Sequence, residues 1–267
     1  LDNQPSVEQM IELYESHGVS PEMMEEAGFE VPEDFYAMVA SEDETVEQVE
    51  EEFDLQGVKK TELLYYSDEY RKEMDAEVRA VRGDWIVLDR TVFYPEGGGQ
   101  EPDTGRLETE SNKYKVVDVQ KQGDVVLHKA PEHSLEKGDE VEGRITWDRR
   151  FQLMQHHSTT HLVNGASKKL LGNHINQAGA HKTVEKGRLD ITHYEKLSRE
   201  ELDEIEEEVR ENIWKDLNIK RESLKKAEAE QEYGFRIYQG GAPPGNEVRI
   251  IKIVDEEEDE LIDVEAC

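Results

Sequence analysis

The sequence predicts an α+β fold: short N-terminal helices, a small antiparallel β-barrel, and then an α+β domain. Three observations support this prediction. Short β-branched runs separated by turn residues fill the middle of the chain, a helical pattern with two histidines follows, and strands and helices then share the remainder. The 267 residues suffice for two to three modest domains. We place the domains at 1–58, 59–147 and 148–267.

The first domain is predicted to contain short helices. Ser6 followed by Gln9 is typical of a capping box. A second helix is expected over 21–28, because proline suits its first turn and glycine its end. Residues 32–39 favour another apolar-faced helix, and the acidic stretch 41–54 favours a linker or an exposed helix.

Six short runs predict the strands of the barrel, because they are rich in β-branched residues and closely spaced. They are 63–66, 76–81, 85–88, 114–119, 125–128 and 141–146. Between them, residues 97–100 read Gly-Gly-Gly-Gln. Consecutive glycines mark either a flexible loop or a place where the backbone approaches another group closely. The amide of Gln100, which both donates and accepts, favours a pocket wall.

The last domain is predicted to mix helices and strands. A long helix is expected over 148–171, and an acidic helix is expected to open with Ser198 and Glu201 as a capping box. The other predicted elements are a strand at 187–192, a short helix at 224–231, and strands at 247–254 and 260–265, with an ordered loop at 240–245.

Two histidines and the single cysteine form a candidate metal site. His157 and His161 lie at i and i+4, which on a helix places both rings on one face. Two imidazoles and the thiolate of Cys267 suit tetrahedral zinc, with water or a later residue as fourth ligand. The same spacing also occurs on partly buried helix faces, and a lone cysteine is often a small buried hydrophobe. The residues alone leave both interpretations open.

The charge balance limits the partners. The formal net charge is −32, from 64 acidic and 32 basic residues, which disfavours non-specific binding to DNA or RNA. An RNA contact would need local basic patches, which could equally be solvated helix faces. The candidates are Arg149, Arg150, Lys182 and Arg188, with Lys168, Lys169, Lys186, Lys220, Arg221, Lys225 and Lys226 as further members.

The chain is expected to be a cytoplasmic segment of a longer protein. One cysteine allows no internal disulfide, which fits a reducing compartment. The sequence starts at Leu1, shows no signal peptide and has no apolar run long enough to cross a membrane.

Four motifs together resemble the editing region of alanyl-tRNA synthetases and, in order and spacing, free-standing proteins that deacylate mischarged tRNA. They lie at 97–100, 157–161, 188–193 and 263–267. Residues 18–22 and 31–40 are similar to the synthetase segment that joins the tRNA-recognition helices to the editing part, which free-standing editing proteins lack. Residues 233–241 resemble the archaeal form. The resemblance covers nearly the whole chain and implies an internal fragment of an archaeal-type synthetase.

The resemblance implies a zinc site on His157, His161 and Cys267, completed by a histidine four residues after Cys267. It implies hydrolysis of the ester in seryl- or glycyl-tRNA(Ala), which an alanine enzyme needs because its pocket cannot exclude glycine and only modestly rejects serine. The partner would be tRNA(Ala), charged or mischarged. The parent enzyme would attach alanine using ATP and Mg²⁺ bound outside this segment, and a homodimer would form through parts outside it.

Within that site, Gln100 is expected to line the pocket, and the N–H groups of Gly98 and Gly99 to donate to substrate or oxyanion. Asp190 is expected either to act as a base or to fix Arg188 or a histidine. Zinc would either activate water or hold substrate and fold in register. Thr91 and Thr192 could read the serine hydroxyl, and His156 is expected to be a neighbour of the ligands.

Four alternatives compete with this interpretation. One is a tRNA-binding module with structural zinc and no catalysis, and another is a free-standing alanyl-tRNA editing protein. A zinc protease would need Glu after the first histidine, where this chain has Ser158. The editing domain of threonyl-tRNA synthetase should lack the Gly-Gly-Gly-Gln segment.

Overall fold

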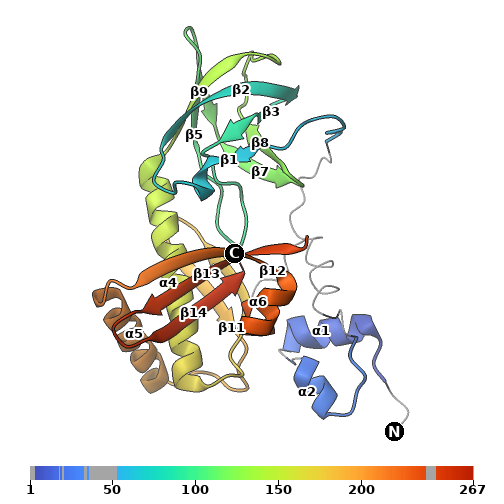
Figure 1. Cartoon of the computed structure of the whole chain (residues 1–267), viewed down its shortest axis with the longest axis vertical. Coiled ribbons are helices and arrows are strands. Elements are labelled where there is room, and N and C mark those ends of the chain that lie inside the picture. The colour runs from blue at the N-terminus through green and yellow to red at the C-terminus, as the bar shows by residue number, and fades with distance from the viewer. Residues whose placement is uncertain are drawn as a thin grey trace. The chain divides into compact units, whose positions relative to one another are not determined.

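The computed structural model describes residues 4–17, 19, 21–32, 35, 53–238 and 245–266. The chain divides into two compact units (Figure 1). The sheet unit comprises 47–157 and 181–187, and the helix–sheet unit comprises 1–46, 158–180 and 188–267. No described helix combines the length and apolar character that a membrane crossing requires.

The sheet unit is built on seven antiparallel strands in the order β6-β5-β9-β2-β3-β8-β7 (Figure 1). Two further strands, β1 and β4, pair in parallel, and a 3-10 turn at Leu64–Tyr66 follows β1. The strands are β1 (Glu62–Leu63), β2 (Glu73–Arg82), β3 (Trp85–Leu88), β4 (Arg90–Thr91), β5 (Gly105–Glu108), β6 (Lys113–Val116), β7 (Asp118–Gln122), β8 (Val125–Lys129) and β9 (Glu140–Ile145).

This sheet is open, so the prediction of a closed barrel is wrong. Closure would require the edge strands β6 and β7 to pair, and no such ladder exists among the described residues. Only Val117 separates the two strands. A hairpin needs at least a two-residue turn, so the chain cannot fold β7 back onto β6. The run predicted as one strand at 114–119 is therefore two strands at opposite edges.

The sheet core follows from the side-chain pattern of its strands. Along β2, Met74, Ala76, Val78 and Ala80 are buried in alternation, as a strand with one face on the core requires. The four residues of β3 are all buried, because apolar clusters cover it on both faces. Continuous and alternating apolar runs thus mark central strands of one sheet.

The helix–sheet unit contains a three-stranded antiparallel sheet in the order β12-β13-β14 and most of the β10-β11 pair, whose connecting residues 181–187 belong to the sheet unit. Helix α4 (Trp147–Leu171) begins in the sheet unit, and the boundary between the units falls between His157 and Ser158. The remaining elements are β10 (Gln177–Lys182), β11 (Gly187–Ile191), α5 (Arg199–Trp214), β12 (Asn218–Lys225), α6 (Lys226–Tyr233), a 3-10 helix η2 (Phe235–Ile237), β13 (Glu247–Asp255) and β14 (Glu260–Ala266).

Both predicted capping boxes are present. Ser198 and Glu201 cap α5 reciprocally, and Ser6 exchanges hydrogen bonds with Gln9 at the start of α1 (Val7–His17). Helix α2 (Pro21–Glu26) starts at its proline. Most of 32–39 and 41–54, and residues 240–244 of the predicted loop, lie outside the described residues.

Candidate functional site

The Gly-Gly-Gly-Gln segment of the sheet unit forms a tight turn. Gly97 N–H donates to Gln100 O over 3.2 Å, and Gln100 N–H donates to Gly97 O over 3.0 Å. Gly98 and Gly99 between them have φ angles of 57° and 69°. Positive φ at both central residues defines a type I′ turn, which non-glycine side chains disfavour. The glycines therefore build an ordered turn.

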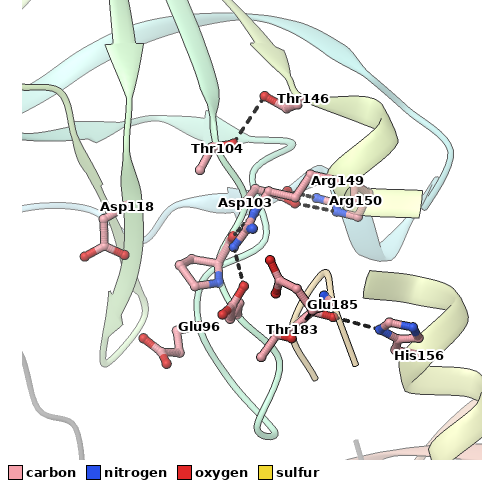
Figure 2. A network of polar contacts seen from close by, with 12 residues as sticks. Glu96, Asp103, Thr104, Asp118, Thr146, Arg149, Arg150, His156, Thr183 and Glu185 are labelled. Atoms are coloured by element: carbon pink, nitrogen blue, oxygen red, sulfur yellow. Dashed lines mark hydrogen bonds and ion pairs between the residues drawn. The ribbon is translucent and has the colours of Figure 1, made fainter. Parts of the chain in front are cut away.

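A buried ion pair holds the base of this loop (Figure 2). Asp103 is 1% exposed and bonds to Arg150, which is 2% exposed and also donates from Nη2 to Val92 O over 2.7 Å. Asp103 Oδ2 accepts from Tyr94 N–H over 2.8 Å. Burial raises the pKa of Asp103, and the Arg150 guanidinium opposes that shift. Arg150, expected on sequence grounds to contact RNA, is instead an interior residue that fixes the loop.

Lys182 holds the tip of the loop. Its ammonium donates to Gly98 O over 2.7 Å, its N–H donates to Gly99 O over 2.6 Å, and it is 3% exposed. Both carbonyls of the turn are therefore fixed. In the described part of the chain, no group accepts a hydrogen bond from the N–H of Gly98 or Gly99. Lys182, another expected RNA contact, lies buried beneath the turn.

Gln100 orients His157. The ring Nδ1 lies 2.9 Å from Gln100 Oε1, and Gln100 is 3% exposed. An amide oxygen only accepts, so the proton lies on Nδ1 and the lone pair on Nε2. The preceding ring, His156, contacts Thr183 O through Nδ1 over 2.7 Å (Figure 2) and Gln152 Nε2 through Nε2 over 2.9 Å. Hydrogen bonding thus occupies both nitrogens of His156.

Carboxylates orient His161 in the helix–sheet unit. Its Nδ1 lies 2.7 Å from Asp263 Oδ2 and 3.1 Å from Glu265 Oε2. Asn164, one turn further along α4, donates from Nδ2 to Asp263 Oδ1 over 3.1 Å. Strand β14 can deliver these carboxylates because Gly165 lets it approach: a Cβ there would lie 2.3 Å from Ile262 O.

His161, Asp263 and Glu265 each offer a ligand atom within 4.8 Å of the others, so the three could hold a cation directly. The separations from Nδ1 also suit hydrogen bonds, and metal-binding imidazoles commonly donate their other N–H to a carboxylate. In that arrangement both His157 and His161 carry the proton on Nδ1 and the lone pair on Nε2. Imidazole nitrogens with this tautomer are suitable zinc donors. Cys267 lies outside the described residues.

Arg188 and Asp190 form an exposed ion pair, and Arg149 forms a partly buried one. Asp190 accepts from Arg188 through Nε and Nη2 at 3.0 and 2.7 Å, and both side chains are largely exposed. Arg149 donates to Glu101 Oε2 over 2.8 Å. The contact with Arg188 is the second of the two roles that the sequence left open for Asp190.

The two threonines considered for reading a serine hydroxyl are already engaged. Thr91 is fully buried, with Oγ1 2.7 Å from His128 Nε2. Thr192 Oγ1 donates to His174 O over 2.7 Å. Their hydroxyls stabilise their own units.

Sequence reasoning missed the supporting residues Asp103, Asn164 and Glu265. Asn164 carried a local signal, because it lies three residues after His161 on the same helix face. Asp103 pairs with Arg150, 47 residues later, and no local pattern reports that contact.

Comparison with known proteins agrees with the motifs. A family model described as tRNA synthetases class II (A) matches residues 2–149. The alanine–tRNA ligase of Pyrococcus abyssi is 47% identical over 273 residues, covering 98% of this chain and 29% of the relative. That of Pyrococcus furiosus is 45% identical over 277 residues, covering 99% and 30%. That of Haloquadratum walsbyi is 42% identical over 275 residues, covering 98% and 29%.

The chain spans about 30% of the length of the curated relatives it matches. The family match extends over more than half of the chain and includes the whole open sheet and its glycine turn. The chain therefore belongs to the family of class II tRNA synthetases (A).

Proposed function

We propose that this chain carries the editing activity of an alanine–tRNA ligase, hydrolysing the ester of seryl- or glycyl-tRNA(Ala). The observation that carries the proposal is the matched support of two histidines on one helix. His157 Nδ1 meets the Gln100 amide, and His161 Nδ1 meets the Asp263 carboxylate. The relatives are named alanine–tRNA ligases, which supports tRNA(Ala) as the substrate. A site that selects alanine needs a separate editing step, because binding alone discriminates poorly against glycine and serine.

His157, His161 and Cys267 would hold zinc in this proposal. The donors fit the metal, because neutral imidazole nitrogen and thiolate sulfur are its common protein ligands. When bound, zinc supplies Lewis-acid chemistry for ester hydrolysis. Asp263 and Gln100 keep the two rings in the tautomer that leaves Nε2 deprotonated.

The glycine turn would stabilise the developing oxyanion. The N–H groups of Gly98 and Gly99 are candidate donors. The bond from Lys182 Nζ to Gly98 O fixes the peptide plane of the Gly99 N–H, and the bond from Gln100 N–H to Gly97 O fixes that of the Gly98 N–H. Donors fixed before reaction pay no reorganisation at the transition state. Arg188, which is exposed, and Arg149, which is partly buried beside Glu101, would contact the tRNA. The parent enzyme would use ATP and Mg²⁺ elsewhere, in the cytoplasm.

A deacylation assay tests the proposal. The chain is incubated with seryl-tRNA(Ala) and, as control, alanyl-tRNA(Ala), and ester loss is followed with time. We expect loss of the seryl ester alone. Gln100→Ala should slow it by roughly tenfold or more, whereas Gln100→Glu keeps an acceptor for His157 and should retain more activity. Asp203→Asn, which removes one charge from the exposed Arg199–Asp203 pair of α5, serves as the control and should leave the rate unchanged.

The same assay separates the main alternative. Retained tRNA binding with ester loss at the uncatalysed rate would indicate a tRNA-binding module with structural zinc.

A second variant tests whether Asp263 orients His161 or binds the metal itself. Asp263→Asn keeps an oxygen acceptor for His161. Zinc content should survive this change if Asp263 orients the ring and fall if Asp263 is itself a ligand.

A further inference from the structure

The helix–sheet unit contains a cavity of about 230 Å³. Its polar walls come from the end of α4, from α5, from η2 and from β14. Lys168, Lys169, Glu208, Asn212 and Arg236 contribute charged and amide groups. None of them belongs to the proposed zinc or oxyanion groups.

The acidic groups of this cavity are already paired. Lys169 Nζ lies 2.9 Å from Glu208 Oε1 and 3.3 Å from Glu260 Oε1. Asp263 accepts from His161 and Asn164. The carboxylates therefore have donors other than the two remaining cations of the cavity.

Those two cations are Lys168 and Arg236. Across the described residues, neither side chain forms an ion pair, and Arg236 donates only from Nε to Tyr233 O over 3.1 Å. Burial lowers the pKa of Lys168, the Asp263 carboxylate opposes this, and the Arg236 guanidinium lowers it further. The dipole of α4 accounts for a cation in its last turn, but Arg236 comes from a separate element. In a chain with 64 acidic residues, two adjacent unpaired cations need another explanation.

We propose that this cavity binds an oxyanion of the phosphate class between Lys168 and Arg236. A guanidinium offers a planar fork of donors and an ammonium a compact charge, the pair of groups that phosphate oxygens accept from most strongly. The amides of Asn173 and Asn212 line the same cavity and add neutral donors. A bound anion also removes the repulsion between the two cations. The anion is either free phosphate or a phosphodiester of an RNA strand.

Calorimetric titration of inorganic phosphate into the chain at low ionic strength tests this site. We expect one saturable site, weakened about tenfold or more by Lys168→Met and by Arg236→Gln, because each removes a charge-assisted hydrogen bond. Lys168→Arg should retain binding. The matched control is Arg210→Gln, which removes an exposed cation from α5 outside the cavity and should leave affinity unchanged.

Absence of saturable binding in the unaltered chain would overturn the proposal, as would equal weakening by Arg210→Gln. If circular dichroism shows that Lys168→Met does not fold, the phosphate affinity of Arg236→Gln, which changes an exposed residue, tests the site instead. A short RNA oligonucleotide then identifies the source of the anion. Competition with phosphate would assign the site to an RNA backbone, and saturable phosphate binding without competition would assign it to a free anion.

Discussion

The histidines of α4 lie one turn apart but are held by different chemistry. His157 in the sheet unit meets a neutral amide on a glycine turn, whereas His161 in the helix–sheet unit meets two carboxylates on a strand. The first support comes from a local turn fixed by backbone hydrogen bonds. The second comes from β14, whose carboxylate lies 102 residues from the histidine in sequence.

This difference shows how one tautomer can be imposed in two ways. An amide holds the ring with no change of charge, and its own position depends on the left-handed backbone that Gly98 and Gly99 adopt in the turn. A carboxylate holds the ring more strongly and needs further partners because it is buried, which Asn164 provides. Breaking the two supports should therefore have unequal effects.

The largest effect is expected from Asp263→Ala. Removing this carboxylate takes away the Asp263 acceptor of Asn164 Nδ2 and one of the two carboxylate acceptors of His161, all of them buried or largely buried, so the free energy of unfolding should fall by about 2 to 4 kcal/mol. Gln100→Ala removes the hydrogen-bond acceptor of the partly buried His157 alone, so the free energy of unfolding should fall by about 1 kcal/mol. Urea unfolding followed by circular dichroism measures both. Equal losses would contradict the difference in support, and Asp203→Ala on the exposed face of α5 is the control.

The second-largest effect is expected from acid, which should destabilise the sheet unit. Burial lowers the pKa of His128 from its ordinary value of 6.5 to about 4. The unfolded chain therefore takes up the proton first as pH falls, so the stability that neutral His128 provides is complete above 6.5 and is lost as pH falls toward 4. The expected slope is roughly 1.4 kcal/mol per pH unit.

Fluorescence in a Trp214→Phe background measures this effect, because Trp85 and Trp147 belong to the sheet unit. His128→Gln should flatten the slope. In the helix–sheet unit, Lys215 lowers the pKa of Asp255. The ion pair between them is therefore lost only at a pH below the range in which carboxyl groups ordinarily titrate. An unchanged slope in His128→Gln would assign the acid sensitivity to another group.

The smallest effect concerns the glycine turn. In Gly98→Ala the added Cβ would meet no other atom within 4 Å, but the residue has a φ of 57°. The free energy of unfolding should therefore fall by about 1 kcal/mol through backbone conformation alone. Gly97→Ala is the matched control: its nearest atom is Pro95 O at 4.0 Å and its φ is not left-handed. Chemical denaturation should therefore separate the neighbours. Equal losses would reject the type I′ turn, and Gly98→Asn should recover part of the loss.

Patterns of local origin were predictable from the sequence. The helix expected over 148–171 is Trp147–Leu171, and the capping box at Ser198 is present, because helix periodicity and caps are encoded within a few residues. The barrel was wrong because closure depends on how the chain passes Val117 from one sheet edge to the other. A strand pattern contains no information on that pairing.

The site was predictable in its motifs but less so in its roles. Arg150 and Lys182 are basic in the sequence, and only the tertiary structure shows that both are buried beneath the glycine loop. Charge is a property of the residue, whereas burial depends on distant neighbours. For the same reason, the support of His161 by Glu265 depends on the close approach of β14 to Gly165.

Zinc stoichiometry of the purified chain tests the central claim most directly. Measured by mass spectrometry of the metal, the unaltered chain should contain one zinc per chain. His157→Ala and His161→Ala should each lose it, while His156→Ala should keep it, because hydrogen bonds to Gln152 and Thr183 occupy that ring. Unchanged zinc content in both ligand variants, or loss confined to His156→Ala, would contradict the proposed site.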